Sequence, residues 1–185
     1  MSKELPIWVN PLLQGLAYWI GYKKQLYPHY HLSEGAIVGE STNIIYSNLE
    51  KSQRLHCEYT YSKILNYDSE YIADLVITEN NKPSIVIEIK RLEAGITRIT
   101  RDFEKLAAIV CFNPNVRCYV LLVCQQKIPK HFVTDKGDSK TGNLKFRAMT
   151  GNVDVKVRRT CKSISSFKEN GIAKANYVCL IEVLR

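Results

Sequence analysis

Two acids and a lysine in neighbouring apolar segments form the arrangement in this sequence that is best suited to chemistry. Glu88 and Lys90 interrupt the apolar run "SIVIEIKRL", and Asp74 interrupts the run "YIADLVIT". In an extended strand Glu88 and Lys90 lie on one face, and the isoleucines that alternate with them point to the other. We therefore expect one face of this strand to be core and the other to be charged.

The turn-forming sequence "ENNKP" separates the two runs and predicts a hairpin that brings Asp74 close to Glu88, although the pattern leaves the register open. Two carboxylates at close range raise each other's pKa unless a cation lies between them. Mg²⁺ is commonly held by one or two carboxylates together with water and a substrate phosphate. Lys90 could then hold or help to deprotonate a water molecule, and stabilise negative charge on the phosphate.

The hydrophobic spacing places these residues in a framework of helices and strands. Helical spacing predicts helices at 10–26 with Asn10 as N-cap, at about 33–51 with Ser33 as N-cap, and at 96–112. Alternating or continuous apolar runs predict strands at 55–62, 71–78, 84–90, 117–125, 144–149, 152–159 and 176–184. We expect the last strand to close the sheet or to pair at its edge. The order predicts a single α/β domain over residues 1–185.

Asp74, the "EIK" sequence that ends at Lys90, and the order helix, three strands, helix, strand resemble the PD-(D/E)XK nuclease superfamily. The resemblance implies a restriction-endonuclease-like fold, in which helices flank a mixed central sheet, with the nuclease-like core at about 34–124. It also implies that Asp74 and Glu88 bind Mg²⁺ or Mn²⁺ and that Lys90 contacts the attacking water. Ala73 stands where the family name has proline, at a position that varies in such enzymes.

A glutamate on the helix before the sheet often adds a metal ligand in nucleases of this kind. Glu40, in the middle of the predicted helix, is our choice for this role, and Glu34 and Glu58 are its competitors. Glu34 could instead favour the N-terminus of its helix, where a negative side chain interacts well with the helix dipole.

The chain of 185 residues has a formal net charge of +8, and most of this excess lies in one late segment. Residues 127–162 contain 10 Lys or Arg against 3 Asp or Glu, whereas residues 1–126 contain 13 of each. Such a basic C-terminal part suits a polyanionic partner. The residues expected to contact nucleic acid there are Lys145, Arg147, Lys156, Arg158 and Arg159.

Basic residues also follow the motif, and the last three of them share one helical face that could follow a phosphate backbone. They are Arg91, Arg98, Arg101 and Lys105. The alternative is pairing within the helix, of Arg98 with Asp102 or of Arg101 with Glu104, and the spacing allows both.

The sequence thus predicts a Mg²⁺-dependent endonuclease that cuts nucleic acid, DNA in preference, by direct attack of water. No serine or cysteine nucleophile with a placed base is visible. A homodimer would suit cleavage of both strands of a duplex. Three alternatives stay open: a solvent-facing ion-pair cluster without chemistry, a catalytically inactive nucleic-acid-binding or assembly module on the same fold, and a domain whose basic face binds an acidic protein.

Cysteine usage and hydropathy predict a cytoplasmic protein without a membrane partner. The 6 cysteines form no C-x-x-C pair and lie mostly in apolar runs, as in proteins that keep their thiols reduced. The sequence has no signal-peptide pattern and no apolar run of about 18 residues.

Overall fold

The sheet at the centre of the protein is mixed. A computed structural model describes residues 4–27, 29, 32–65, 68–92, 96–149, 151–163 and 175–185. Within these ranges, seven strands form one sheet in the order β1-β2-β3-β4-β7-β6-β5. The strands are β1 (Gln53–Thr60), β2 (Ile72–Glu79), β3 (Lys82–Arg91), β4 (Arg117–Cys124), β5 (Asn143–Ala148), β6 (Gly151–Ser163) and β7 (Asn176–Val183). β3 and β4 run parallel, and the other neighbouring strands run antiparallel.

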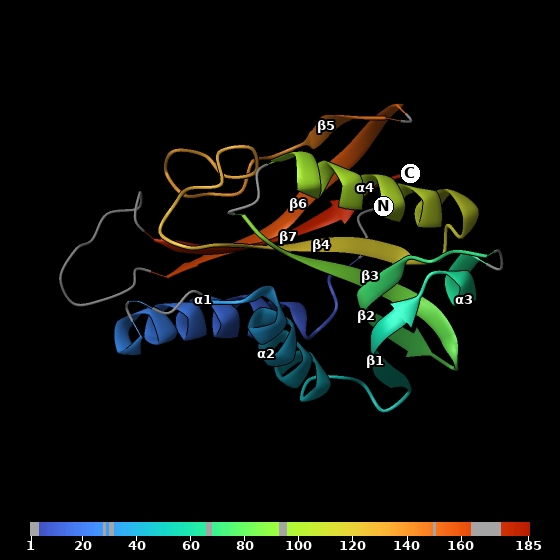
Figure 1. The fold of residues 1–185 in the computed structure, drawn as a ribbon, viewed down its shortest axis with the longest axis horizontal. Coiled ribbons are helices and arrows are strands. Elements are labelled where there is room, and N and C mark those ends of the chain that lie inside the picture. Colours follow the sequence, from blue (N-terminus) through green and yellow to red (C-terminus); the bar gives the residue numbers. More distant parts are fainter. Residues whose placement is uncertain are drawn as a thin grey trace.

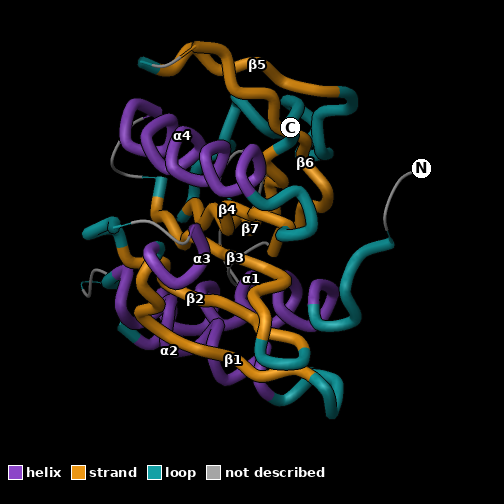
Figure 2. Tube along the Cα trace, turned by 90° about the vertical axis from the view of Figure 1, so that its right-hand side faces the viewer, coloured by secondary structure: helices purple, strands orange, loops and turns teal. Residues whose placement is uncertain are grey.

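Helices cover both faces of this sheet, so the chain is a single α/β domain (Figures 1 and 2). The helices in the described part of the chain are α1 (Val9–Leu26), α2 (Glu34–Tyr46), α3 (Ser62–Leu65) and α4 (Ile96–Phe112). α1 and α2 lie on one face, and α4 lies on the other and connects β3 to β4. The parallel β3 and β4 therefore end at the same edge, between the two helical layers.

Each helical layer has its own core because the central strands are apolar on both faces. Phe103 and Leu106 of α4 pack in one core with Val86 of β3 and its neighbours. The other core contains residues of α1 and α2 with Ile87 and Leu121. β3 thus sends alternate side chains into opposite layers, and Glu88 shares the α4 side with Val86.

The ends of the first two helices differ from the sequence expectation in part. Ser33 caps α2 as predicted, because its Oγ accepts a hydrogen bond of 3.1 Å from the Ala36 N–H. α2 stops at Tyr46, however, five residues earlier than expected. The prediction that Asn10 caps α1 is wrong, since the helix begins one residue before it and Trp8 occupies the cap position.

The position of β7 also corrects the sequence analysis. β7 pairs with β4 on one side and with β6 on the other, so it lies inside the sheet and not at its edge. Its composition agrees with this position. Residues 176–181 are all buried, and strands that are apolar on both faces are typical of the middle of a sheet that helices cover on both sides.

The helices and cysteines can be compared with the expected absence of a membrane span and with the expected burial of the thiols. None of the helices in the described ranges is long and apolar enough to cross a bilayer. Cys118, Cys124 and Cys179 are buried free thiols, as their apolar surroundings predict. Cys57 and Cys111 are free and exposed.

Candidate active site

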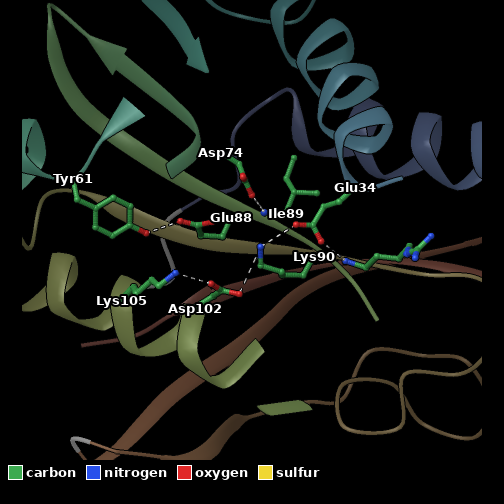
Figure 3. Close-up of polar contacts among 9 residues, drawn as sticks. Glu34, Tyr61, Asp74, Glu88, Ile89, Lys90, Asp102 and Lys105 are labelled. Carbon is green, nitrogen blue, oxygen red and sulfur yellow. Dashed lines mark hydrogen bonds and ion pairs between the residues drawn. The ribbon is translucent and has the colours of Figure 1, made fainter. Parts of the chain in front are cut away.

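The regular pairing of the strands is interrupted at Asp74, on β2. The ladder between β2 and β3 begins with the pair Leu75 and Ile87. Beside it, Oδ2 of Asp74 accepts a hydrogen bond of 2.7 Å from the Ile89 N–H, in place of a backbone carbonyl (Figure 3). On the neighbouring β1, Glu58 has a φ of 51°, in the left-handed region that side chains seldom adopt. The hydrogen bond from Ile89 therefore fixes the Asp74 carboxylate at the point where the regular pairing of β2 with β3 ends.

Glu88 lies next to this opening and is almost completely buried, with 3% of its surface exposed. Its Oε1 accepts a hydrogen bond of 2.6 Å from the Tyr61 hydroxyl, which stands just before α3. Burial raises the pKa of the Glu88 carboxyl to about 8; the Tyr61 hydrogen bond and Lys90 oppose this rise, and Asp74 and Asp102 add to it. A nearby cation would lower this pKa and favour the carboxylate.

Lys90 joins both helical layers at the end of β3. Its Nζ lies 3.1 Å from Oε1 of Glu34 on α2 and 3.9 Å from Oδ2 of Asp102 on α4. Burial favours a lower pKa for this ammonium group, but Asp102, Glu34 and Asp74 outweigh it, and the pKa of Lys90 is raised. Lys90 therefore keeps its positive charge at neutral pH. It is suited to neutralising negative charge and not to accepting a proton from water.

The structure thus brings Asp74, Glu88 and Lys90 to one place, where Asp74 raises the pKa of both other groups. Figure 3 shows the three side chains together, between α2 on one side and α4 on the other. The hairpin predicted from the "ENNKP" turn accounts for this proximity, because β2 and β3 are antiparallel neighbours.

Asp102 belongs to this cluster, although its spacing along the chain predicts only an ion pair with Arg98. It is 4% exposed and lies among the apolar residues of α4 that face the sheet. Its Oδ1 accepts a hydrogen bond of 3.4 Å from Nζ of Lys105. Oδ2 has no hydrogen-bond partner among the residues that the structure describes.

A sequence signal for Asp102 does exist. Ile99, Phe103 and Leu106 form an apolar stripe on α4, and Asp102 is the acid that interrupts it. An acid on a buried stripe is costly unless it has partners, as it is in a buried strand. The same reasoning that selected Asp74 would have selected Asp102. Its actual partners, Lys90 and Lys105, explain why its burial is tolerated.

A groove of about 600 Å³ opens beside Asp74, between α2 and β1. Its acidic lining residues are Glu34, Glu58 and Asp74, and Glu40 is not among the residues that line it. Six residues along a helix turn the side-chain direction by about 240°, so Glu34 and Glu40 point in different directions. Glu34, one of the two competitors from the sequence, is the α2 acid at this site.

The donor set suits a hard divalent cation, but the carboxylates are spread out. Among the described residues, no group of three His, Cys, Asp or Glu side chains is placed to hold a metal ion. Asp74 and Glu88 each use one oxygen in a hydrogen bond within the protein and have a second oxygen to offer. The acids that surround Lys90 and Lys105 are Glu34, Asp74, Glu88 and Asp102. This excess of negative charge is what one added cation would offset.

The basic residues predicted to bind nucleic acid are spread over several elements. Arg98 and Arg101 are exposed on α4, and Lys145 and Arg147 are exposed on β5. Arg91 is tied to the start of α2, since its guanidinium donates to the carbonyl oxygen of Leu32 and its N–H donates to Glu34 over 3.4 Å.

On β6, Lys156 is half-buried and Arg159 is exposed, whereas Arg158 has a clear structural role. Nε of Arg158 lies 3.3 Å from Oε2 of Glu182, and Nε of Arg117 lies 3.0 Å from Oε1 of the same residue. All three side chains are nearly buried, with 11 to 14% exposed. This cluster accounts for Arg158 without a contact to nucleic acid.

Comparison with known proteins gave no match, whether to a family model, to a curated protein or to a solved structure.

Proposed function

We propose that this protein is a Mg²⁺-dependent nuclease that hydrolyses phosphodiester bonds, with DNA as the substrate. The observation that carries the proposal is the meeting of Asp74, Glu88 and Lys90 at one edge of the sheet, where acids outnumber lysines and Glu88 and Asp102 are buried. The order α2-β1-α3-β2-β3-α4-β4, in which the four-residue α3 is inserted between β1 and β2 and α4 joins the parallel β3 and β4, supports the resemblance to PD-(D/E)XK nucleases.

In this proposal Asp74 and Glu88 would hold the metal, and Glu34 would take the role that the sequence assigned to Glu40. Bound Mg²⁺ or Mn²⁺ would supply a more acidic water molecule and stabilise charge on the phosphate. Tyr61 keeps the Glu88 carboxylate oriented through its hydrogen bond. Lys90 stabilises the negative charge that develops on the phosphate.

Asp102 gives Lys90 a second anchor in this arrangement. With Glu34 as a metal ligand, Asp102 on α4 would keep the Lys90 ammonium group in place, since its Oδ2 lies 3.9 Å from Nζ of Lys90. Arg98 and Arg101, exposed on the same helix, could contact the phosphate backbone nearby.

A second candidate function is a nucleic-acid-binding or assembly module without catalysis. One observation favours it: Asp74 and Glu88 both already accept hydrogen bonds from the protein, and three ligands are not gathered in the described part of the chain. The basic residues alone would suffice for such a module.

A cleavage assay distinguishes the nuclease from the binding module. The protein is incubated with end-labelled single-stranded or duplex DNA in Mg²⁺, Mn²⁺ or a chelator. We expect metal-dependent cleavage that falls by roughly a hundredfold or more in Asp74→Ala, Glu88→Gln and Lys90→Met. Binding of the same DNA in Ca²⁺ should change little. Glu34→Gln and Glu40→Gln form a matched pair on α2, and only the first should reduce cleavage. Binding without cleavage by the unmodified protein under all three conditions would support the binding module.

A further inference from the structure

The second half of α1 and the residue after it carry exposed aromatic side chains and lysines. Tyr18, Tyr22 and Tyr27 are 74%, 59% and 53% exposed. Lys23 and Lys24 stand among them, and the helix contains no acidic residue. Aromatic side chains interleaved with lysines are typical of surfaces that bind single-stranded nucleic acid, because every base offers a flat face for stacking.

A pocket of about 280 Å³ lies between the end of α1 and the start of α2 and is lined by five residues. They are Trp19, Lys23, Tyr27, Leu32 and Ala36. Nζ of Lys23 lies 5.7 Å from the centre of the Trp19 ring and 5.6 Å from that of the Tyr27 ring. Leu32 is buried and forms an apolar base for the pocket. The pocket thus offers two aromatic surfaces, an apolar base and one positive charge.

The segment that begins α2 links this pocket to the candidate active site. Leu32 lines the pocket, and its carbonyl oxygen accepts the hydrogen bond from the Arg91 guanidinium. Glu34, two residues further on, contacts the ammonium group of Lys90 at 3.1 Å. Residues 32–34 therefore contact the pocket at one end and the end of β3 at the other.

We propose that this pocket receives one unpaired base of the nucleic acid that the site acts on. The base stacks against Trp19 and Tyr27, and Lys23 pairs with the adjoining phosphate. Bases inside a duplex are covered by their neighbours on both faces, so the substrate is single-stranded or carries an unpaired nucleotide near the cut. This inference takes the nucleic acid from the proposed function and adds the class of substrate.

Fluorescence offers a direct measurement. The protein has 2 tryptophans, and Trp8 is fully buried against Tyr119, so quenching by a bound base reports on Trp19. We expect an oligothymidylate of about 20 nucleotides to quench the emission in Ca²⁺ and to bind the unmodified protein more tightly than a duplex of equal length. Equal or tighter binding of the duplex would overturn the proposal.

Tyr27→Ala should weaken binding of the single strand by roughly 5- to 100-fold, as expected for one lost stacking partner. Tyr46→Ala is the matched control, because Tyr46 is 72% exposed on α2 and outside the pocket. Trp19→Phe keeps a ring, and should keep the affinity while losing the quenching. Affinity unchanged in Tyr27→Ala would overturn the proposal. Concentration-dependent dimerisation that Tyr27→Ala abolishes would also overturn it, in favour of a second copy of the chain on this surface.

The outcome stays separate from that of the proposed nuclease activity. Quenching and affinity are measured in Ca²⁺, and cleavage is measured in Mg²⁺ or Mn²⁺, so either result can be obtained without the other. If the unmodified protein cleaves DNA with neither Mg²⁺ nor Mn²⁺ but the oligothymidylate still quenches its fluorescence, the nuclease proposal fails and the base pocket stands. If single strands are cleaved equally well by the unmodified protein and by Tyr27→Ala, the pocket fails and the nuclease stands.

Discussion

Two charged clusters lie on the same sheet, near opposite ends of β4, and their balance of charge is reversed. At one end, Glu182 is held between the guanidinium groups of Arg117 and Arg158. At the other, Lys90 is surrounded by acids, and Glu88 has a raised pKa. The first cluster satisfies its carboxylate completely within the protein. The second leaves negative charge that only protonation or an added cation can offset.

The contrast suggests how a structural ion cluster can be told from a functional one. A carboxylate with two arginines within hydrogen-bonding distance gains stability from the fold and has nothing to offer a ligand. A set of carboxylates that raise each other's pKa costs stability in the free protein, as functional sites often do. Substitutions in the two clusters test this difference.

Glu182→Ala should be the most destabilising of these changes, because it leaves two nearly buried arginines without their carboxylate. We expect a loss of about 3 to 5 kcal/mol in the free energy of unfolding, measured by urea denaturation. Asp74→Asn is the comparison in the acidic cluster. The amide oxygen can still accept the hydrogen bond from Ile89, so the loss should stay below about 1 kcal/mol. Equal losses in the two variants would show that the clusters do not differ as described.

Glu88→Gln should stabilise the protein at alkaline pH. The folded pKa of about 8 lies above the usual 4.5, so the folded state binds the proton more tightly than the unfolded state. Stability is therefore lost as pH rises from about 4.5 to about 8, by roughly 1.4 kcal/mol per pKa unit. The substituted glutamine does not ionise, and the variant should gain a few kcal/mol at alkaline pH. Urea midpoints at a series of pH values check this, and a gain that is the same at acidic pH would contradict it.

Ca²⁺ should raise the stability of the unmodified protein through the acidic cluster. A free concentration of about 100 times the dissociation constant adds about 2.7 kcal/mol, which thermal unfolding with Ca²⁺ or chelator can measure. The gain should be lost in Asp74→Ala and kept in Glu40→Ala. A stabilisation that survives in Asp74→Ala would place the cation elsewhere.

Lys105→Met should have the smallest effect. The side chain is 32% exposed, and its ion pair with Asp102 at 3.4 Å is partly screened by solvent. We expect a change below about 1 kcal/mol in the free energy of unfolding. Lys90→Met, at the better buried lysine of the same cluster, is the comparison and should cost more. A larger loss in Lys105→Met would show that this lysine is the main partner of Asp102.

The sequence was informative where residues interrupt a regular pattern. The acids in β2 and β3 stand out against apolar runs, and the turn between them makes their proximity predictable. Single-sequence patterns were weaker on the helices. Glu34 and Glu40 both lie on α2, and which of them faces the site depends on how the helix is rotated against the sheet. That rotation is set by side-chain packing, which a single sequence does not show.

The order of strands beyond β4 was likewise out of reach. The apolar run of β7 indicates that the strand is buried, but it does not indicate which strands pair with it. Arg158 illustrates the same limit, because its partner Glu182 is on a strand whose place in the sheet was not predictable. Alternation along β6 correctly separates the buried Val155 and Val157 from Lys156 and Arg158, which alternate with them. It does not say whether those charges face water or another strand.

The position of β7 has a consequence for how the chain folds. β1 to β4, which carry Asp74, Glu88 and Lys90, emerge from the ribosome well before β7, and they can form their own ladders early. Until β7 arrives, one side of the apolar β4 has no neighbour and is exposed to pairing with other chains. Nascent protein should therefore be most prone to aggregate after the acidic site has been made and before the sheet is sealed.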